Sequence, residues 1–213
     1  MKLFMLGSSG LVGSTCYSKL LLEKEAPQIV SFSRRRLNLH GGQERVSDLK
    51  DIETLMTGLD ADTALCSVGT TLKKAKSRAA FEEVDLNLPL RFAVAAKNHG
   101  VKNFHLLTAL GADPISKNYY LRIKGVLEKE IRSLGFQSLN IYRPSLLLGH
   151  RDEFRLAEEL ATGVYRRFQA IYPKVLNKYR PIEVEKLTGF IIRKLFENPN
   201  GVQVYENQDM LGG

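Results

Sequence analysis

Short apolar runs alternate with segments of helical spacing through most of the chain. Residues 2–6 (KLFML) form a continuous apolar run, and residues 11 to about 23 place apolar side chains three and four positions apart. Continuous apolar runs are typical of the buried strands of parallel sheets, and the wider spacing is typical of helices packed on them. Further strands are predicted at 28–33, 45–49, 63–69, 102–109, 137–144 and 201–206, and further helices at 52–58, 79–98, 117–133 and, with breaks at Gly163 and Pro173, up to Phe196.

This alternation continues to about residue 145, which predicts an α/β fold with a doubly wound parallel sheet. No Pro/Ser-rich linker, internal repeat or low-complexity stretch interrupts it, so we expect residues 1–213 to form a single domain. The less regular residues 150–213 are expected to contribute a small C-terminal cap on the substrate side of the same sheet.

Three glycines follow the first predicted strand at intervals of three residues. In a sheet of this kind, the turn after the first strand meets the ligand. Gly7 permits a tight turn, Gly10 lets the backbone approach a diphosphate, and Gly13 lets the helix pack closely on the sheet, with its N–H groups facing the negative charge. The spacing differs from the usual G-x-G-x-x-G, so a purely structural turn is the alternative. The residues predicted to hold a dinucleotide here are Gly7, Ser8, Ser9, Gly10, Leu11, Val12 and Gly13.

The end of the second predicted strand indicates which dinucleotide is bound. A site specific for NAD places Asp or Glu here to accept a hydrogen bond from the ribose 2′-hydroxyl. This chain instead has Ser33, Arg34, Arg35 and Arg36, and a guanidinium pairs with a phosphate that a carboxylate would repel. We therefore expect NADP(H) as the cofactor, with Arg34 as the main contact of its 2′-phosphate. The alternative is a loop of solvent-facing arginines.

The formal net charge of +8 gathers in two clusters, at Arg34 to Arg36 and at 73–78 (KKAKSR). Such clusters suit an anionic small molecule, and they are also common in solvated loops. Nucleic acid is a less favoured partner, because no aromatic side chains lie among these cations to stack on bases.

Cysteine, histidine and apolar-run patterns set further limits. The chain has two cysteines and four histidines, and neither set has the spacing of a zinc site or a disulfide framework. No metal site is therefore expected. No run of about 20 apolar residues is present, and the start MKLFML is too short for a secretory signal. We expect no membrane segment and a cytoplasmic location.

Tyr120 and Lys124 stand four residues apart, on one face of the helix predicted at 117–133. Of the eight tyrosines, Tyr120 alone has a lysine at this spacing. A nearby ammonium favours the phenolate form, so the pair suits proton transfer to or from a carbonyl oxygen during hydride exchange. Thr108, at the end of the strand at 102–109, offers a hydroxyl to the same oxygen. The alternative is a surface pair on an amphipathic helix.

Taken in order, several phrases of the chain resemble the atypical, epimerase-like branch of the short-chain dehydrogenase/reductase superfamily, and in particular the Tat-interacting-protein-like oxidoreductases. These phrases are GSSGLVGS, the arginines after SFS, SVGTT, VDLNLPL, AAKNHGVKNFHLLTALGAD, YYLRIKGVLEKEI and YRPSLLLGHR. The resemblance implies a Rossmann-type fold that binds NADP(H). It also implies a catalytic set of serine, tyrosine and lysine, in which Tyr120 and Lys124 hold the matching positions.

The resemblance implies contacts with the cofactor beyond the glycine loop. Two residues would flank the adenine, three would line the cofactor at the end of the fourth predicted strand, and one would lie near the nicotinamide. In that order these are Asp48 and Leu49; Ser67, Val68 and Gly69; and Pro144.

One position departs from the pattern of the relatives. They carry a Ser-Ser pair where this chain has Thr108-Ala109, so a carbonyl-orienting hydroxyl is kept only if Thr108 occupies the position of the catalytic serine. The branch also contains redox-sensing regulators. Three hypotheses therefore stand: an NADPH-dependent reductase of a small carbonyl compound, an NADP(H) sensor that reports to a protein partner and, least favoured, a nucleic-acid binder.

Overall fold

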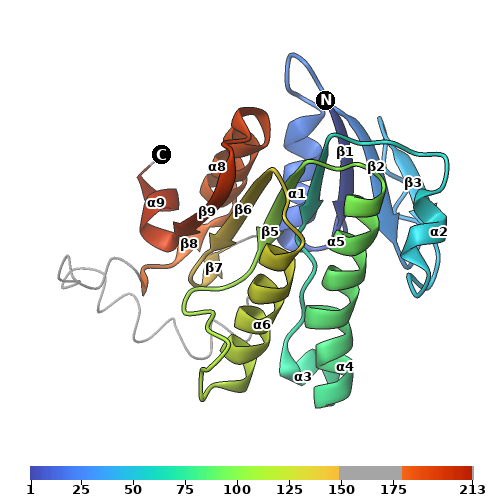
Figure 1. Ribbon diagram of the computed structural model, residues 1–213. Coiled ribbons are helices and arrows are strands. Elements are labelled where there is room, and N and C mark those ends of the chain that lie inside the picture. Colours follow the sequence, from blue (N-terminus) through green and yellow to red (C-terminus); the bar gives the residue numbers. More distant parts are fainter. Residues whose placement is uncertain (149–178, 213) are drawn as a thin grey trace.

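The computed structural model describes residues 1–148 and 179–212, and within them seven strands form one parallel sheet (Figure 1). The strand order is β3-β2-β1-β4-β5-β6-β9, and every neighbouring pair is parallel. The chain begins at β1, winds outwards to β3, and then returns past β1 to continue towards β9. This is the Rossmann-type order, so the predicted fold class is confirmed. The strands are β1 (Lys2–Leu6), β2 (Gln28–Ser33), β3 (Gln43–Val46), β4 (Thr63–Cys66), β5 (Asn103–Leu107), β6 (Ser138–Arg143) and β9 (Gly201–Glu206).

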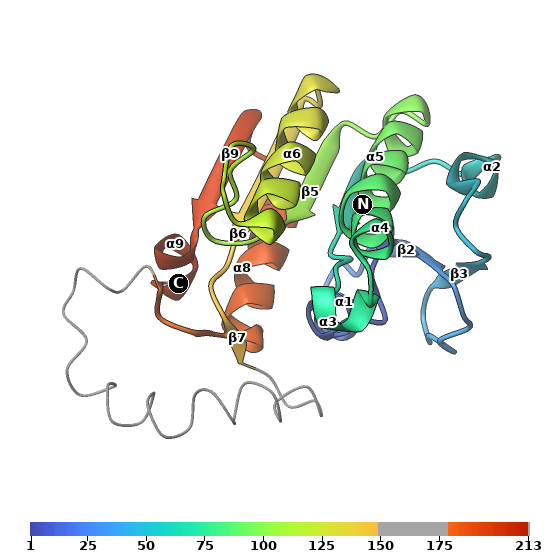
Figure 2. The same ribbon diagram turned by 90° about the horizontal axis from the view of Figure 1, so that it is seen from below.

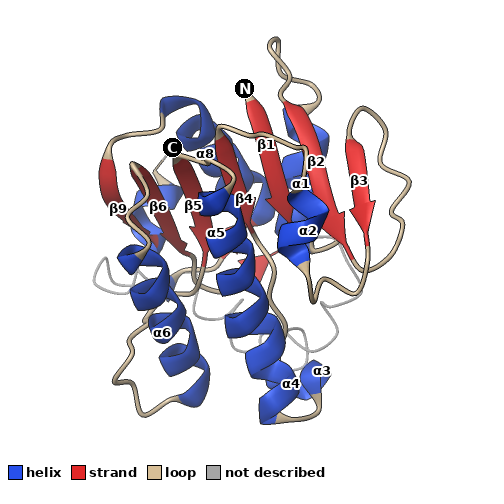
Figure 3. Cartoon of the chain, turned by 45° about the vertical axis from the view of Figure 1, so that its right-hand side comes forward, coloured by secondary structure: helices blue, strands red, loops and turns tan. Residues whose placement is uncertain are grey.

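Helices cover both faces of the sheet (Figures 2 and 3). Along β1, Leu3 and Met5 join the core under α1 and α8, whereas Phe4 and Leu6 join the core under α2, α5 and α6. This burial on both faces explains the continuous apolar run that predicted the strand. The described helices are α1 (Leu11–Leu20), α2 (Ile52–Met56), α3 (Leu72–Ala75), α4 (Arg78–Glu82), α5 (Leu88–Asn98), α6 (Tyr119–Ser133), α8 (Val184–Glu197) and α9 (Asn207–Leu211).

The helix predicted at 79–98 is interrupted by a π-helical turn, η1 (Glu83–Asn87), which joins α4 to α5. Pro89 explains the interruption, because it has no N–H to donate to the carbonyl of Asp85 four residues earlier and its ring crowds that carbonyl. Asp85 itself is fully buried. Apolar spacing predicted the helix but gave no sign of the wider turn.

The described part of the expected cap belongs to the core layers instead. Within residues 179–212, β9 pairs with β6 at the edge of the sheet, and α8 packs beside α1 on one face. A short strand β8 (Ile182–Glu183) pairs with β7 (Leu147–Leu148). Residues 149–178, with the helix breaks expected at Gly163 and Pro173, lie outside the described residues, so a substrate-side cap there stays a prediction.

Candidate functional site

The glycine loop lies between β1 and α1, at the point where the strand order reverses. Because β2 and β4 flank β1 on either side, the carboxyl end of β1 is where parallel α/β sheets bind ligands. Gly7 has a φ of +103°, and a Cβ there would lie 2.7 Å from Val68 N. A Cβ on Gly13 would lie 2.1 Å from Gly7 O. These two glycines are needed for the close packing of loop, helix and β4, whatever the loop binds.

Gly10 serves a different purpose, because the fold leaves space beside it. It is the N-cap of α1, with φ −80° and ψ 166°, an extended conformation open to any residue. Among the described atoms, a Cβ on Gly10 would meet only Gly7 O, at 3.4 Å. Gly10 also lines a cavity, so a side chain there would take space from a ligand. The unpaired N–H groups of the first turn of α1 suit a negative charge at this end of the helix.

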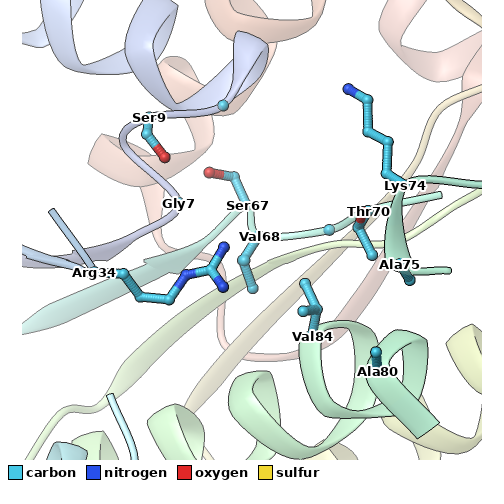
Figure 4. Close-up of a pocket in the computed structure, with 12 residues that line it drawn as sticks. Gly7, Ser9, Arg34, Ser67, Val68, Thr70, Lys74, Ala75, Ala80 and Val84 are labelled. Atoms are coloured by element: carbon cyan, nitrogen blue, oxygen red, sulfur yellow. The ribbon is translucent and has the colours of Figure 1, made fainter. Parts of the chain in front are cut away.

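A cavity of about 350 Å³ opens beside the loop (Figure 4), and small-molecule sites span about 300–1,000 Å³. Its described lining includes two cations, Arg34 and Lys74, and no carboxylate. The two cations enter from opposite sides of the cavity in Figure 4. The cavity therefore favours an anionic ligand. Its lining consists of Gly7, Ser9, Gly10, Arg34, Ser67, Val68, Gly69, Thr70, Lys74, Ala75, Ala80 and Val84.

Other predicted residues of the glycine loop point away from the cavity and hold the loop against the core. Ser8 is buried, and its Oγ accepts a hydrogen bond from Ser31 Oγ at 2.7 Å. Val12 is buried in the core beneath α1, and Leu11 packs against the same cluster. The structure thus brings Gly7, Ser9 and Gly10 to the cavity and gives the remaining loop residues packing roles.

The turn after β2 carries Arg34 to the cavity. Ser33 is buried, and its Oγ donates a hydrogen bond to Arg35 O at 2.7 Å, which holds the turn. Both arginines are exposed, but Arg34 lines the cavity and its guanidinium reaches toward Val68 (Figure 4), whereas Arg35 lies outside the lining. Of the predicted residues at the end of β2, Arg34 is the one that the structure brings to the glycine loop.

Asp48 and Leu49 follow β3, and neither lines the cavity. Asp48 is exposed, and its Oδ1 accepts a hydrogen bond from the Lys50 N–H at 3.0 Å. Leu49 is buried, with a φ of +62°, and its side chain packs in the core with α2 and α5. The Leu49 side chain is therefore committed to the core, and contact of these residues with an adenine stays a prediction.

Lys124 on α6 forms a buried ion pair with Asp85 of η1. Lys124 Nζ lies 2.7 Å from Asp85 Oδ1, and the two side chains are 4% and 0% exposed. The other oxygen, Asp85 Oδ2, accepts a hydrogen bond from the Thr70 N–H at 2.8 Å. A Cβ on Gly69 would lie 3.3 Å from Asp85 Oδ1 and 3.5 Å from Lys124 Nζ. Because Gly69 lines the cavity, the ion pair lies directly beneath the cavity wall.

Asp85 is the main site residue that the sequence analysis missed. The available signal was a single acid within the apolar phrase VDLNLPL, at a position where helical spacing turns the side chain toward the sheet. Buried carboxylates are rare without a partner. The sequence therefore indicated that this acid has a buried partner, although identifying Lys124 as that partner required the fold.

The ion pair changes the electrostatics expected for Tyr120. Burial raises the pKa of the Tyr120 phenol, Lys124 lowers it and Asp85 raises it, so that the pKa lies above its ordinary value. Burial by itself lowers the pKa of Lys124, but Asp85 and Tyr120 outweigh it and raise the pKa. Lys124 thus carries its proton at neutral pH. Its expected support of a phenolate is present, but burial and Asp85 outweigh it.

Thr108 points its hydroxyl into a buried polar network between β5, α6 and β6. Its Oγ1 donates to Glu128 Oε1 at 2.7 Å and also lies 3.2 Å from Tyr142 O. Glu128 is 3% exposed, and Arg143 holds both of its oxygens, at 3.0 and 2.6 Å. A hydroxyl has one proton to donate. In this arrangement the Thr108 hydroxyl donates its one hydrogen bond to Glu128 and has none to donate to a substrate carbonyl.

Pro144 lies outside the cavity lining. Its carbonyl accepts a hydrogen bond from the Leu110 N–H at 2.9 Å, which ties the loop after β6 to the loop after β5. Contact of Pro144 with a nicotinamide therefore stays a prediction.

Tyr119, next to Tyr120, donates a hydrogen bond from its hydroxyl to Glu82 Oε1 at 2.8 Å. Tyr119 thus joins α6 to α4 by this bond.

The described residues contain no group of three or more His, Cys, Asp or Glu side chains that could hold a metal ion. Cys16 and Cys66 are buried, and burial raises the pKa of each thiol to about 12. Neither thiol is reactive at neutral pH. Within the same residues, no helix has both the length and the apolarity to span a bilayer.

Comparison with known proteins adds relatives that match most of the chain. No family model matches it. The chain is 29% identical to Protein HTATIP2 of Rattus norvegicus over 98% of this chain and 87% of that protein. It is 36% identical to Protein FMP52, mitochondrial, of Meyerozyma guilliermondii, over 71% of this chain and 67% of that protein. A Scheffersomyces stipitis relative, Protein FMP52-2, mitochondrial, is 34% identical over 76% and 73% of the two chains.

Solved structures share the fold at low sequence identity. MoeE5, in a complex with UDP-glucose and NAD, superposes with a TM-score of 0.73 at 13% identity, over 96% of this chain and 75% of that one. A UDP-glucose 4-epimerase of Thermus thermophilus, in a complex with NAD, gives 0.71 at 16% identity, over 100% and 81% of the two chains. These similarities support the Rossmann-type fold.

The relatives correct the expected location. Proteins named FMP52, mitochondrial, from several fungi match this chain, so the cytoplasmic location inferred from the sequence is wrong. The inference failed because an absence of long apolar segments argues against secretion and membrane spanning only. It carries no information about mitochondrial import, which amphipathic and basic segments direct.

Proposed function

This chain belongs to the atypical branch of the short-chain dehydrogenase/reductase superfamily, with the Tat-interacting-protein-like and FMP52 proteins, and on that premise we propose that it is an NADP(H)-dependent oxidoreductase. Its substrate is a small carbonyl compound. The observation that carries the proposal is the cavity at the switch point, which combines the glycine loop with Arg34 and Lys74 and has no carboxylate in its described lining.

The cavity fits the central part of a dinucleotide phosphate. Gly10 leaves room for a diphosphate at the N-terminus of α1, where the first N–H groups of the helix are without intrahelical partners. Arg34 supplies a cation at the end of β2, where a 2′-phosphate-binding site requires one and where an NAD-specific site requires an acid. These features support NADP(H) over NAD(H).

Tyr120 and Lys124 are the residues proposed to move the proton. The bound cofactor supplies or accepts a hydride. Tyr120 donates its phenolic proton to the substrate oxygen during reduction, and its raised pKa keeps that proton in place at neutral pH. Lys124 stays charged because Asp85 holds its ammonium, so it stabilises the phenolate that forms.

The test is a panel of aldehydes and ketones assayed with NADPH, for the wild type and for Tyr120→Phe. We expect turnover in the wild type, and a loss of about 10²–10⁴-fold in Tyr120→Phe with unchanged NADP⁺ affinity. Tyr119→Phe is the matched control, because it removes a neighbouring phenolic hydroxyl that bonds to Glu82 and has no proposed part in proton transfer. It should keep the wild-type turnover. Equal turnover in Tyr120→Phe and the wild type would refute the proton-transfer role.

One observation favours a second candidate, an NADP(H)-sensing regulator with little or no catalysis. The Thr108 hydroxyl donates its one hydrogen bond to Glu128, and the next residue is Ala109, which has no hydroxyl. A site that binds the cofactor without a carbonyl-orienting group suits sensing, with a protein partner as the recipient of the signal. Absence of turnover on the whole panel, in a protein that binds NADP⁺, would favour this candidate.

A further inference from the structure

Lys74 is the second cation of the cavity, and neither the family resemblance nor the motif spacing assigned it a role. It lies in the basic segment 73–78, which composition alone left open as a solvated loop or an anion site. All three lysines of this segment are exposed, but among them Lys74 alone lines the cavity, and Lys73 and Lys76 lie outside its lining. One lysine of the cluster is thus aimed at the site.

A defined local structure holds Lys74 in this position. Thr71 caps α3, and its Oγ1 accepts a hydrogen bond from the backbone N–H of Lys74 at 3.2 Å. Lys76 ends the helix in the left-handed conformation, with a φ of +65°. Capping at one end and a left-handed residue at the other fix which side of this single turn faces the cavity.

The two cations address different ends of the cavity. Arg34 comes from the end of β2 and reaches toward Val68, below Ser67 in Figure 4. Lys74 comes from the opposite side of the cavity, across from Ser9 of the glycine loop in Figure 4. A dinucleotide phosphate carries two separate anionic groups, the diphosphate and the 2′-phosphate. Two cations at two ends match that distribution of charge.

We propose that Lys74 is a cofactor-binding residue that pairs with the diphosphate opposite the glycine loop, leaving the 2′-phosphate to Arg34. The proposal rests on the dinucleotide site proposed above. The glycine loop offers the diphosphate backbone N–H groups, the Ser9 hydroxyl and the partial charge of the α1 terminus, but no full positive charge. Lys74 adds a full positive charge to that site. Because NAD(H) and NADP(H) share the diphosphate, Lys74 strengthens the binding of both, and Arg34 discriminates between them.

Titration calorimetry with NADP⁺ and NAD⁺ tests this division on the wild type, Lys74→Gln, Lys73→Gln and Arg34→Ala. Lys74→Gln should weaken the binding of both dinucleotides by a similar factor, about tenfold, and leave the ratio of their affinities unchanged. Arg34→Ala should weaken the binding of NADP⁺ alone. Lys73→Gln is the matched control, with the same loss of charge one residue away, and should bind as the wild type does.

The outcomes separate this inference from the function on which it rests. Wild-type protein that binds neither dinucleotide would overturn the proposed function itself. Wild-type binding with unchanged affinities in Lys74→Gln would overturn only the role of Lys74. A loss in Lys74→Gln confined to NADP⁺ would also overturn it, because the lysine would then pair with the 2′-phosphate. A loss of equal size in Lys73→Gln would show a general effect of charge and would likewise contradict the assignment.

Discussion

Lys124 Nζ and Asp85 Oδ1 lie 2.7 Å apart in the interior, and the pair joins α6 to the π-helical turn η1 beneath Gly69. Both charges are removed from water, which costs free energy that only their mutual contact and further hydrogen bonds offset. The Thr70 N–H supplies one such bond to Asp85. The pair therefore connects the wall of the cavity to the helix that carries Tyr120.

Removal of one partner of this pair should destabilise the fold strongly. Asp85→Asn leaves the Lys124 ammonium buried without a counter-charge, and we expect a loss of about 3–5 kcal/mol in the free energy of unfolding. Urea denaturation measures it. The double variant Asp85→Asn/Lys124→Met should recover much of the loss, since no unpaired charge remains. A single variant within about 1 kcal/mol of the wild type would contradict the buried pair.

Substitutions at Gly13 and Gly10 should separate folding from binding. Gly13→Ala places a Cβ 2.1 Å from Gly7 O, so we expect a loss of at least about 2 kcal/mol in stability. The fold has space for the side chain of Gly10→Val, so the free energy of unfolding of this variant should lie within about 1 kcal/mol of the wild-type value. The variant should nevertheless lose dinucleotide binding. Urea denaturation and calorimetry on both variants provide the comparison. Wild-type affinity in a folded Gly10→Val would show that the loop is a structural turn only.

His105 should make the stability depend on pH. Its ring is fully buried, with Nδ1 2.8 Å from Tyr142 Oη and Nε2 2.9 Å from Asn198 Oδ1. The Asn198 oxygen can only accept, so Nε2 carries the proton of a neutral ring and Nδ1 accepts from the tyrosine. Burial lowers the pKa of His105 to about 4, although the bond to Asn198 raises it.

The sign of this effect follows from proton binding. Between about pH 6.5 and 4, the unfolded chain protonates the histidine and the folded chain does not. Stability should therefore fall as the pH falls through this range, by roughly 3 kcal/mol in all. Urea denaturation across pH 4.5–7 should show a flatter profile for His105→Gln than for the wild type. His40→Gln, in an exposed loop, should keep the wild-type slope. Parallel profiles for wild type and His105→Gln would refute the buried neutral ring.

The fold was largely readable from the sequence, because burial on both faces of a parallel sheet leaves unbroken apolar runs such as KLFML. The interruption at η1 could not be predicted from apolar spacing, since the buried positions across it, Phe81, Asp85, Leu88, Phe92 and Ala96, keep ordinary helical intervals of three and four. Pro89 was the local sign of it, through its missing N–H. The strand at 201–206 was predicted, but its place beside β6 depends on long-range pairing that no local pattern records.

The site residues also differ in whether local sequence features could predict them. Gly7, Gly10 and Arg34 were identified because strand ends and glycine spacing are local features, and the structure brings all three to one cavity. Lys74 and Asp85 were missed as site residues, since their roles depend on which elements meet across the sheet edge. The orientation of Thr108 toward Glu128 was beyond reach for the same reason: its partner lies 20 residues further along, on another element.

The most direct test of the central claim is a calorimetric comparison of NADP⁺ and NAD⁺ binding to the wild type and to Arg34→Ala. Charge-assisted bonds to a phosphate contribute about 1.5–3 kcal/mol, so the wild type should bind NADP⁺ roughly tenfold to a hundredfold more tightly. Arg34→Ala should abolish that preference, while Arg36→Ala, outside the cavity lining, should retain it. Equal affinities in the wild type, or binding of neither dinucleotide, would contradict the account.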